Sequence, residues 1–395
     1  MSYKGQVKSF PFSRKANPGV FFIAISQFGM AFSFQCILGF MPFYIAKISP
    51  YGPKETIVWI GLIMGASNLV ASVTASFWGG IAARGRPKLL FELGMFVNGT
   101  LILLLGFTSN LHLLLLMRVL QGVLGGVSTV GYILISHLSP SERLHKDLSL
   151  FQSSITAGQL VGPPIGAYIA SLLGYKAPFI AAFLVVSVFI LFCHRNVPDI
   201  VVQKSEAASA RGLPKGVLFA WALILMATIH ITFLPSILPK ILEGFNVVGD
   251  QAVRTAGLII MGYTGSAIVG NFLFSRLASK VGVRRVIAIA SLSGSLFLLS
   301  LFLSRGVWSF TALRMVEIGS VAPLIPLTFA LFARNVSGRA IGFMNSARFI
   351  GMAGGAFLAT FLVAYSSLLV LYLLIALFTA VSTLAFLRTE RSHEL

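Results

Sequence analysis

The chain has 395 residues, of which 56% are hydrophobic and only 10% are charged, and its mean hydropathy is +0.90. This composition excludes an ordinary water-soluble domain and predicts a protein embedded in lipid. In a soluble chain the net charge of +19 would favour nucleic acid as a partner, but here the position of the charges indicates membrane topology. We therefore expect the lipid bilayer as a partner and no nucleic acid.

About twelve apolar stretches follow one another from Val20 to Leu387, each long enough to cross the hydrocarbon core of a bilayer as a helix. The sequence therefore predicts an all-α membrane protein with twelve transmembrane helices. The expected spans are 20–46, 56–82, 89–108, 111–137, 148–173, 177–194, 217–242, 253–275, 284–304, 307–333, 340–364 and 367–387.

The basic residues are divided unevenly between the two sides that these spans define. An even number of spans places both termini on one side, and most of the 30 Lys and Arg residues fall there. The opposite side has only Lys47, Lys54, Lys176, Lys240, Arg254 and Arg305. Because positive residues favour the cytoplasmic side, both termini are predicted to be cytoplasmic.

A single long polar stretch separates the first six expected spans from the last six, and it reads as a linker between two bundles. The two parts resemble each other, since Met117-Arg118 in the fourth span has a counterpart in Leu313-Arg314 in the tenth. The predicted organisation is a cytoplasmic tail at 1–19, a six-helix bundle at 20–194, a cytoplasmic linker at 195–216, a second six-helix bundle at 217–387 and a cytoplasmic tail at 388–395.

The fifth expected span carries closely spaced glycines and prolines, at Gly158, Gly162, Pro163 and Gly166. Glycines four residues apart let a neighbouring helix approach closely, and prolines loosen the local hydrogen bonding so that the helix can bend. The pattern is typical of a hinge, or of tight helix packing alone.

The fourth span contains Arg118 and Gln121 ahead of a run of glycines. A buried guanidinium keeps its proton, so Arg118 can hold a carboxylate ionised or bind an anion, but it cannot carry the proton itself. The alternative is a structural charge bonded to carbonyl groups.

These motifs resemble the major facilitator superfamily, and more closely its twelve-helix drug:proton antiporters, including the tetracycline- and multidrug-exporter branch of Gram-negative inner membranes. The fifth span is similar to the family's Gly-x-x-x-Gly-Pro-x-x-Gly-Gly motif, with the last glycine changed to Ala167. The resemblance implies two six-helix halves containing inverted repeats, a monomer, and an inner-membrane location. It also implies no cofactor, with the proton gradient as the energy source.

The loop between the second and third spans resembles the family's cytoplasmic gate loop, with a departure. The matching residues are Gly79, Gly80, Arg84, Arg86 and Lys88. Ala83 stands where the family has Asp, and Ser279 occupies the equivalent place in the second half. Alanine can make neither the charge contact nor the helix-terminus contact of that Asp, so we expect the gate to be held differently.

Proton coupling requires a group that binds and releases protons. Of the eleven acidic residues, only Glu92 and Glu317 lie within expected spans. Burial and neighbouring charges move the pKa of such a carboxylate toward working pH. Glu317 lies about ten residues into the tenth span, with Arg314 one turn away on the same face. Because the first, fourth, seventh and tenth helices line the cavity of the resembled fold, Glu317 is the expected proton carrier. The alternative is a permanent ion pair that orients the helix.

The other candidates are weaker. Glu92 can be an i,i+4 partner of Lys88, and His230 can be a proton relay or a neutral side chain bonded to a neighbouring helix. Arg348 has a structural and a substrate-binding interpretation. The expected proton-coupling set is Glu317, Arg314, Arg118, His230 and Glu92. The expected substrate cavity contains Gln27, Gln35, Arg118, Gln121, His230, Arg314, Glu317 and Arg348.

The predicted function is a proton-coupled antiporter that exports small amphipathic compounds or drugs by rocking its two halves. Three arginines against two acids within the spans favour an alternative, a dedicated exporter of an anionic metabolite such as a carboxylate siderophore. A membrane receptor or partner without flux is the alternative of another class. Since the sequence has no paired nucleophile and base and no metal-ligand cluster, we expect neither an enzyme nor a bound metal.

Overall fold

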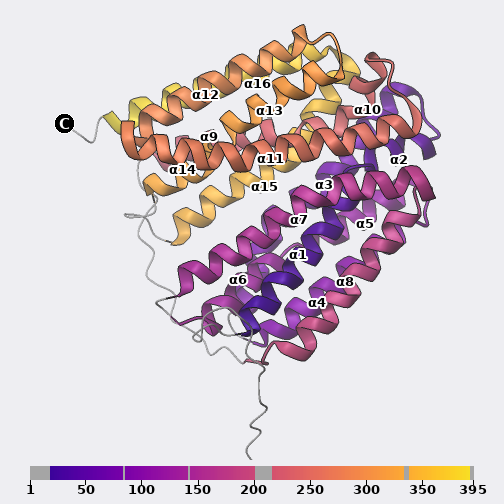
Figure 1. Cartoon of the computed structure of the whole chain (residues 1–395), viewed down its shortest axis with the longest axis vertical. Helices are drawn as coiled ribbons and strands as arrows, with labels where there is room; N and C mark the ends of the chain where they lie inside the picture. Colours follow the sequence, from indigo (N-terminus) through magenta and orange to yellow (C-terminus); the bar gives the residue numbers. More distant parts are fainter. Residues whose placement is uncertain (1–17, 83–84, 141–142, 201–215, 333–337, 392–395) are drawn as a thin grey trace, which may run out of the picture.

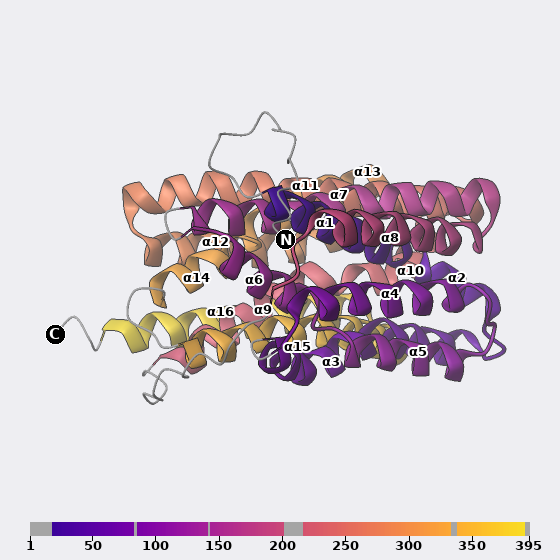
Figure 2. The same ribbon diagram turned by 90° about the horizontal axis from the view of Figure 1, so that it is seen from below.

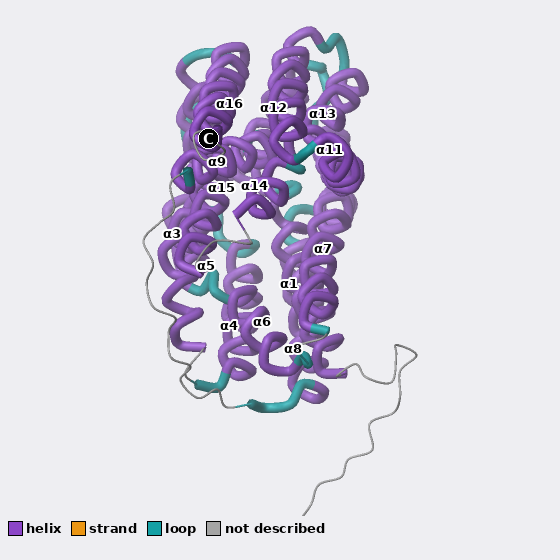
Figure 3. The backbone as a smooth tube through the Cα atoms, turned by 90° about the vertical axis from the view of Figure 1, so that its left-hand side faces the viewer, coloured by secondary structure: helices purple, strands orange, loops and turns teal. Residues whose placement is uncertain are grey.

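The computed structural model describes residues 18–82, 85–140, 143–200, 216–332 and 338–391, and the regular elements in these ranges are all helices (Figures 1 and 3). In chain order they are α1 (Pro18–Leu38), α2 (Met41–Ile48), α3 (Pro53–Ala82), α4 (Pro87–Leu105), α5 (Leu111–Val123), α6 (Val127–Leu138), α7 (Leu144–Leu173), α8 (Ala177–Asn196), α9 (Val217–Thr232), α10 (Leu234–Gly244), α11 (Gly249–Val281), α12 (Val283–Ser300), the 3-10 turn η1 (Leu301–Leu303), α13 (Val307–Val321), α14 (Leu324–Phe332), α15 (Gly338–Tyr365) and α16 (Leu368–Arg391).

Eleven segments of the described ranges are long and apolar enough to cross a membrane, so the chain is a multi-pass membrane protein. The expected span at 148–173 is not among the eleven. It corresponds to α7, which forms a 30-residue helix but carries polar residues such as Gln152 and Gln159 along its length. The twelfth span and the cytoplasmic location of the termini stay predictions.

Four of the expected spans are each divided into two helices, whereas the sequence predicts one continuous helix for each span. They are the first and fourth of each half: α1 with α2, α5 with α6, α9 with α10, and α13 with α14. Proline lacks the N–H that continues a helix, and it stands in the first turn of α2 and of α10 and in the break before α14. Between α5 and α6 the break falls at Gly125-Gly126.

The two parts of the chain repeat one pattern of helix packing. In the first, α1 packs on α7 and α8, α3 on α5, and α4 on α6 and α8. In the second, α9 packs on α15 and α16, α11 on α13, and α12 on α14 and α16. We refer to α1–α8 as the first half and α9–α16 as the second half. They meet where α3 packs on α15 and α7 packs on α11 (Figure 2).

These contacts between the halves are closest near one end of the molecule, which we call the distal end because it lies away from Pro18 and Arg391, where the described chain begins and ends. A Cβ atom added at Gly61 of α3 would lie 1.8 Å from Oγ1 of Thr360, and one at Gly257 of α11 would lie 2.8 Å from Cβ of Ala167. At the same end Nε of Arg254 donates to Oγ of Ser171 at 2.7 Å. Figure 1 shows the ribbons of the halves converging toward α2 and α10 and diverging toward α6 and α14.

Candidate functional site

Three polar side chains of the second half form a buried cluster. His230 of α9 and Arg314 and Glu317 of α13 are each 0% exposed. Nδ1 of His230 lies 2.7 Å from Oε1 of Glu317, and Arg314 forms an ion pair with the other carboxylate oxygen. Arg314 also donates to the backbone oxygen of His230 at 2.6 Å. Helix α13 is thereby joined to α9 by a closed set of charge-assisted hydrogen bonds.

Aromatic rings surround the guanidinium of this cluster. Its carbon lies 4.6 Å from the centre of the Phe233 ring and 5.1 Å from that of Tyr263. Such contacts stabilise a cation away from water. The Nε atom of Arg314 is buried without a hydrogen-bond partner. Among the predicted residues, the structure therefore brings His230, Arg314 and Glu317 together inside the second half.

The second ring nitrogen of His230 contacts Thr379 of α16, with 3.0 Å between Nε2 and Oγ1. The Thr379 hydroxyl is also 2.8 Å from the carbonyl oxygen of Ile375. A hydroxyl has a single proton to donate, so it serves one of these two acceptors at a time.

This choice couples the hydroxyl to the protonation of the cluster. When Thr379 donates to Nε2, the imidazole is neutral, its proton is on Nδ1, and Glu317 is ionised. When Thr379 donates to the Ile375 oxygen, Nε2 must carry a proton of its own to donate to the Thr379 oxygen. The hydrogen bond between Nδ1 and Glu317 then needs a second proton, which is either on Nδ1 or on the carboxylate. The same heavy-atom positions therefore accommodate two states that differ by one proton.

Arg118 lies at the corresponding position of the first half but has no carboxylate partner among the described residues. It donates to the backbone oxygens of Ile63 at 3.0 Å and Met64 at 3.4 Å, both on α3. It also donates to Oε1 of Gln121 at 2.8 Å and lies 5.0 Å from the ring centre of Phe34. Arg118 is thus separate from the His230 cluster and ties α5 to α3 and α1.

The two glutamines of α1 differ in their surroundings. Gln27 is buried, and its Oε1 atom has no hydrogen-bond partner in the part of the chain that the structure describes. Gln35 is partly buried, and its Cβ would lie 2.9 Å from a Cβ added at Gly162 of α7. Gln35 therefore lies beside the glycine motif.

Glu92 lies in the first half, away from the His230 cluster. Nζ of Lys88 is 3.8 Å from its Oε1, at the predicted i,i+4 spacing, and Nδ1 of His194 is 3.2 Å from its Oε2. Lys88 also donates to the backbone oxygen of His194 at 2.9 Å. These contacts join the start of α4 to the end of α8.

The residues of the expected gate loop are described only in part. Gly79 and Gly80 lie in α3, and Arg86 precedes α4 as an exposed residue. Arg84 and Ala83 lie outside the described residues. In the second half, Ser279 donates to the backbone oxygen of Arg276 at 2.7 Å, a contact within its own helix.

The glycine motif of α7 forms the contact with α1. A Cβ added at Gly158 would lie 2.7 Å from the Phe32 nitrogen, and one at Gly166 would lie 1.9 Å from the Cys36 oxygen. Pro163 lies inside the helix, and its backbone oxygen would be 2.8 Å from a Cβ at Gly39. Only glycine permits backbones to approach this closely.

The second half has a counterpart of this motif, in which Gly351 and Gly355 of α15 face α9. A Cβ at Gly351 would lie 2.7 Å from Cβ of Thr228, and one at Gly355 would lie 2.5 Å from Oγ1 of Thr232. Arg348 precedes these glycines on α15 and is partly buried.

Thr379, which contacts His230 from 149 residues away, is not among the residues predicted from the sequence. A threonine within an apolar span gives no distinct signal, because its hydroxyl is commonly bonded to its own helix. Tyr132 of α6 is likewise not among the predicted residues. Its hydroxyl donates to Oε1 of Gln152 of α7 at 2.5 Å. The signal that the sequence offers for both residues is a polar side chain within an expected membrane span.

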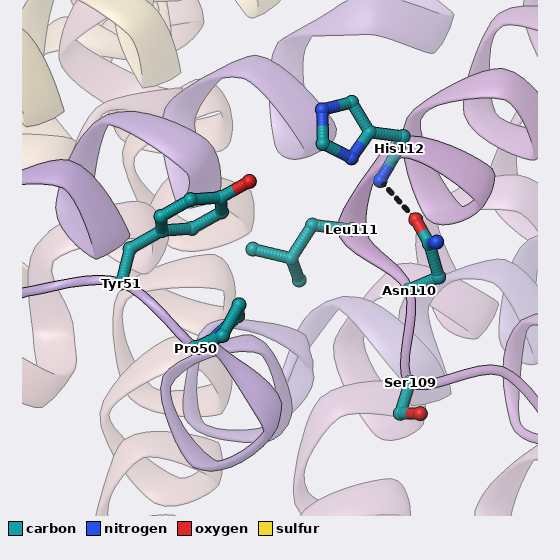
Figure 4. A pocket seen from close by; sticks show the side chains of 6 residues that line it. All are labelled: Pro50, Tyr51, Ser109, Asn110, Leu111 and His112. Carbon is teal, nitrogen blue, oxygen red and sulfur yellow. Dashed lines mark hydrogen bonds between the residues drawn. The ribbon is translucent and has the colours of Figure 1, made fainter.

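A pocket of about 430 Å³ lies at the distal end, between the turn after α2 and the start of α5 (Figure 4). Its lining residues are Pro50, Tyr51, Ser109, Asn110, Leu111 and His112. The Asn110 side chain accepts from the backbone nitrogen of His112 at 2.9 Å and so caps α5. This pocket shares no residue with the buried cluster.

Comparison with known proteins identifies the family. The model of the Major Facilitator Superfamily matches residues 23–249 and 219–395. The chain belongs to this superfamily. It is therefore a transporter rather than an enzyme, and the resemblance stated from its motifs is confirmed.

Its relatives include proteins named for multidrug resistance. The multidrug resistance protein MdtG of Klebsiella pneumoniae is 26% identical over 361 residues, which cover 87% of this chain and 86% of that protein. The MdtG protein of Serratia proteamaculans is 25% identical over 337 residues and covers 82% of each chain.

Solved structures share the fold at low sequence identity. A D-xylose-proton symporter is similar with a TM-score of 0.76 and 12% identity, over 95% of this chain and 98% of that one. The human organic anion transporter MFSD10 has a TM-score of 0.70 and 13% identity, over 93% and 99%. At such identities the likeness shows the fold alone.

Proposed function

We propose that this transporter is a proton-coupled antiporter that exports small amphipathic compounds across the inner membrane. The observation that carries the proposal is the buried contact between His230 and Glu317, with Arg314 as counter-charge. The similarity to proteins named for multidrug resistance supports the substrate class.

A carboxylate in contact with an imidazole supplies two side chains that can each bind a proton, so the pair can serve as a proton store. Arg314 supplies the counter-charge of the carboxylate. The Thr379 hydroxyl can adjust to a change in the protonation of His230, since it can donate either to His230 or to the Ile375 oxygen of its own helix. Binding and release of a proton then require little movement of heavy atoms.

The cluster is also one helix away from the contact between the halves. His230 lies on α9 between Thr228 and Thr232, which face the glycines of α15. Helix α15 in turn packs on α3 of the first half. A change of hydrogen bonding at His230 would therefore act on the helix that must shift when the halves rock.

Alternating access would involve the contacts between the two halves at the distal end. The positive-inside rule assigns the distal end to the outside and both termini to the cytoplasm. The close approach of Gly61 to Thr360 and of Gly257 to Ala167 would then close the outer side. Opening it would require these contacts and the Arg254–Ser171 hydrogen bond to separate.

The test uses liposomes that contain the purified protein and a pH-sensitive dye. A proton gradient is imposed, and proton movement is recorded after addition of cationic drugs and, separately, of anionic metabolites. We expect substrate-triggered proton movement that is lost in Glu317→Gln. The matched control is Glu243→Gln, which changes an exposed glutamate paired with Lys240 and should leave the movement unchanged. Proton movement that survives Glu317→Gln would contradict this assignment of the proton site.

A second candidate function is dedicated export of an anionic metabolite, such as a carboxylate siderophore, with the same machinery. It is favoured by Arg348, for which the described residues provide no ion-pair partner. Growth tests against dyes and antibiotics, set beside tests of metabolite secretion, separate the two. Resistance to unrelated drugs supports the broad exporter, and secretion without resistance supports the dedicated one.

A further inference from the structure

Arg348 stands where the first half has an apolar residue. Gly351 of α15 faces α9 as Gly158 of α7 faces α1, so the two helices can be compared in register. Arg348 is three residues before Gly351, and Ile155 is three residues before Gly158. The fold therefore accepts an aliphatic side chain at this position, and packing alone does not require a guanidinium.

No protein group of the described ranges neutralises this cation. Its Nε atom is buried without a hydrogen-bond partner, and no ion pair of Arg348 occurs within those ranges. Arg314 has Glu317, and Arg118 has two backbone oxygens and Gln121. A partly buried charge without a partner is costly, and that cost is removed when an anion binds.

The acids within the expected spans are engaged elsewhere. Glu317 is bonded to Arg314 and His230, and Glu92 is bonded to Lys88 and His194. In the described part of the chain, no carboxylate is left at this depth to serve as the counter-charge of Arg348.

Tyr132, which belongs to the other half, lies within electrostatic range of Arg348. The Tyr132 hydroxyl donates to Oε1 of Gln152, and this leaves the amide N–H groups of Gln152 without a described acceptor. The exposed side chain of Gln152 lies on α7, eight residues from the start of that helix. Tyr132 thus holds an amide of the first half, with N–H groups left to donate, within reach of a cation of the second half that has no partner in the described ranges.

We propose that Arg348, Tyr132 and Gln152 form an anion-recognising subsite between the two halves, which takes the carboxylate of an amphipathic substrate. The planar guanidinium matches a carboxylate with two parallel hydrogen bonds, and Gln152 supplies further N–H donors. Because the donors come from both halves, a bound carboxylate would link them. The inference rests on the proposed function and deepens it by naming the substrate class.

The test compares two dyes that differ at one group. Rhodamine 110 has a free carboxylate, and rhodamine 123 is its methyl ester. Binding of each dye to the purified full-length protein is measured by fluorescence polarisation without a proton gradient. We expect rhodamine 110 to bind more tightly, and Arg348→Gln to weaken its binding about tenfold or more, because a charge-assisted hydrogen bond is lost. Binding of the ester should change little.

Two further variants make the result specific. Arg348→Lys keeps the charge but loses the planar fork, so it should retain part of the preference. Arg276→Gln removes another arginine of the second half, one that stacks on Phe272 with 4.0 Å from the guanidinium carbon to the ring centre. It should leave both affinities unchanged.

Equal affinity of the natural protein for the two dyes, binding of neither, or an equal loss of both affinities in Arg348→Gln would overturn the proposed subsite. Failure of antiport is separate, because it is measured as proton movement in liposomes. A protein that discriminates the carboxylate but moves no protons keeps the subsite and loses the antiport mechanism. A protein that moves protons with drugs but does not discriminate the carboxylate keeps the antiport mechanism and loses the subsite.

Discussion

The two halves of this transporter each bury an arginine at the same position of their fourth span, but they satisfy it differently. Arg118 of α5 bonds to backbone oxygens of α3 and to Gln121, three residues later. Arg314 of α13 bonds to Glu317, three residues later, and to the backbone of His230. Both guanidinium groups also lie over a phenylalanine ring, Phe34 in the first half and Phe233 in the second.

These different partners determine which arginine can take part in proton chemistry. Backbone oxygens and an amide do not titrate, so the contacts of Arg118 are the same at any physiological pH. Glu317 and His230 can each gain a proton, so the contacts of Arg314 depend on the protonation state. Of these two buried arginines, only Arg314 contacts residues whose side chains can exchange protons within the described part of the chain.

The largest expected effect is the removal of one member of the second-half ion pair. Glu317→Gln or Arg314→Gln should destabilise the protein by about 3–5 kcal/mol, because the remaining charge is left buried without its partner. The melting temperature in detergent would measure this. The double variant Arg314→Gln/Glu317→Gln should be less destabilised than the sum of the single variants, and simple additivity would argue against a coupled pair.

A second comparison concerns the glycines that hold the first helix of each half. Gly166→Ala places a Cβ 1.9 Å from the backbone oxygen of Cys36, so we expect a loss of about 1–3 kcal/mol or more from overpacking. Gly355→Ala should cost less, because the nearest atom is the side-chain oxygen of Thr232. Gly354→Ala meets open space and serves as the control. Thermal unfolding of the three variants tests this order.

The arginine of the first half should be less sensitive than that of the second. Arg118→Gln loses hydrogen bonds to Ile63 and Met64 but leaves no carboxylate unpaired, so we expect a cost of about 1–3 kcal/mol. Substrate-triggered proton movement in liposomes should persist. Its complete loss in a folded Arg118→Gln protein would show that the first half also takes part in coupling.

The smallest effect is expected from making the first half resemble the second. Gln121→Glu supplies Arg118 with a carboxylate at the spacing that Glu317 has from Arg314. The change should alter stability by no more than about 1 kcal/mol, since a new buried ion pair gains roughly what its desolvation costs. A melting curve measures it, and a shift comparable to that of Glu317→Gln would refute the distinction between the halves.

Several features of the site were accessible from the sequence because they are local. Arg314 and Glu317 are three residues apart on one helix, and Lys88 and Glu92 are four apart, so helical geometry alone predicts each contact. His194 at Glu92 and Thr379 at His230 come from distant helices and have no local signature. The division of four spans into two helices has a local cause in its prolines and glycines, but hydropathy averaged over a span does not register it.

Residue types and their order along the chain are enough to place this protein in a membrane, to identify the segments that are apolar enough to span it, and to single out the charged residues within those segments. They are enough because the transfer of a side chain into lipid depends on the residue type and its neighbours along the chain. The folded molecule is needed to show that His230 contacts Glu317, that Thr379 contacts His230, and that Arg348 has no carboxylate partner in the described ranges. These relations depend on how helices far apart in the sequence pack against one another.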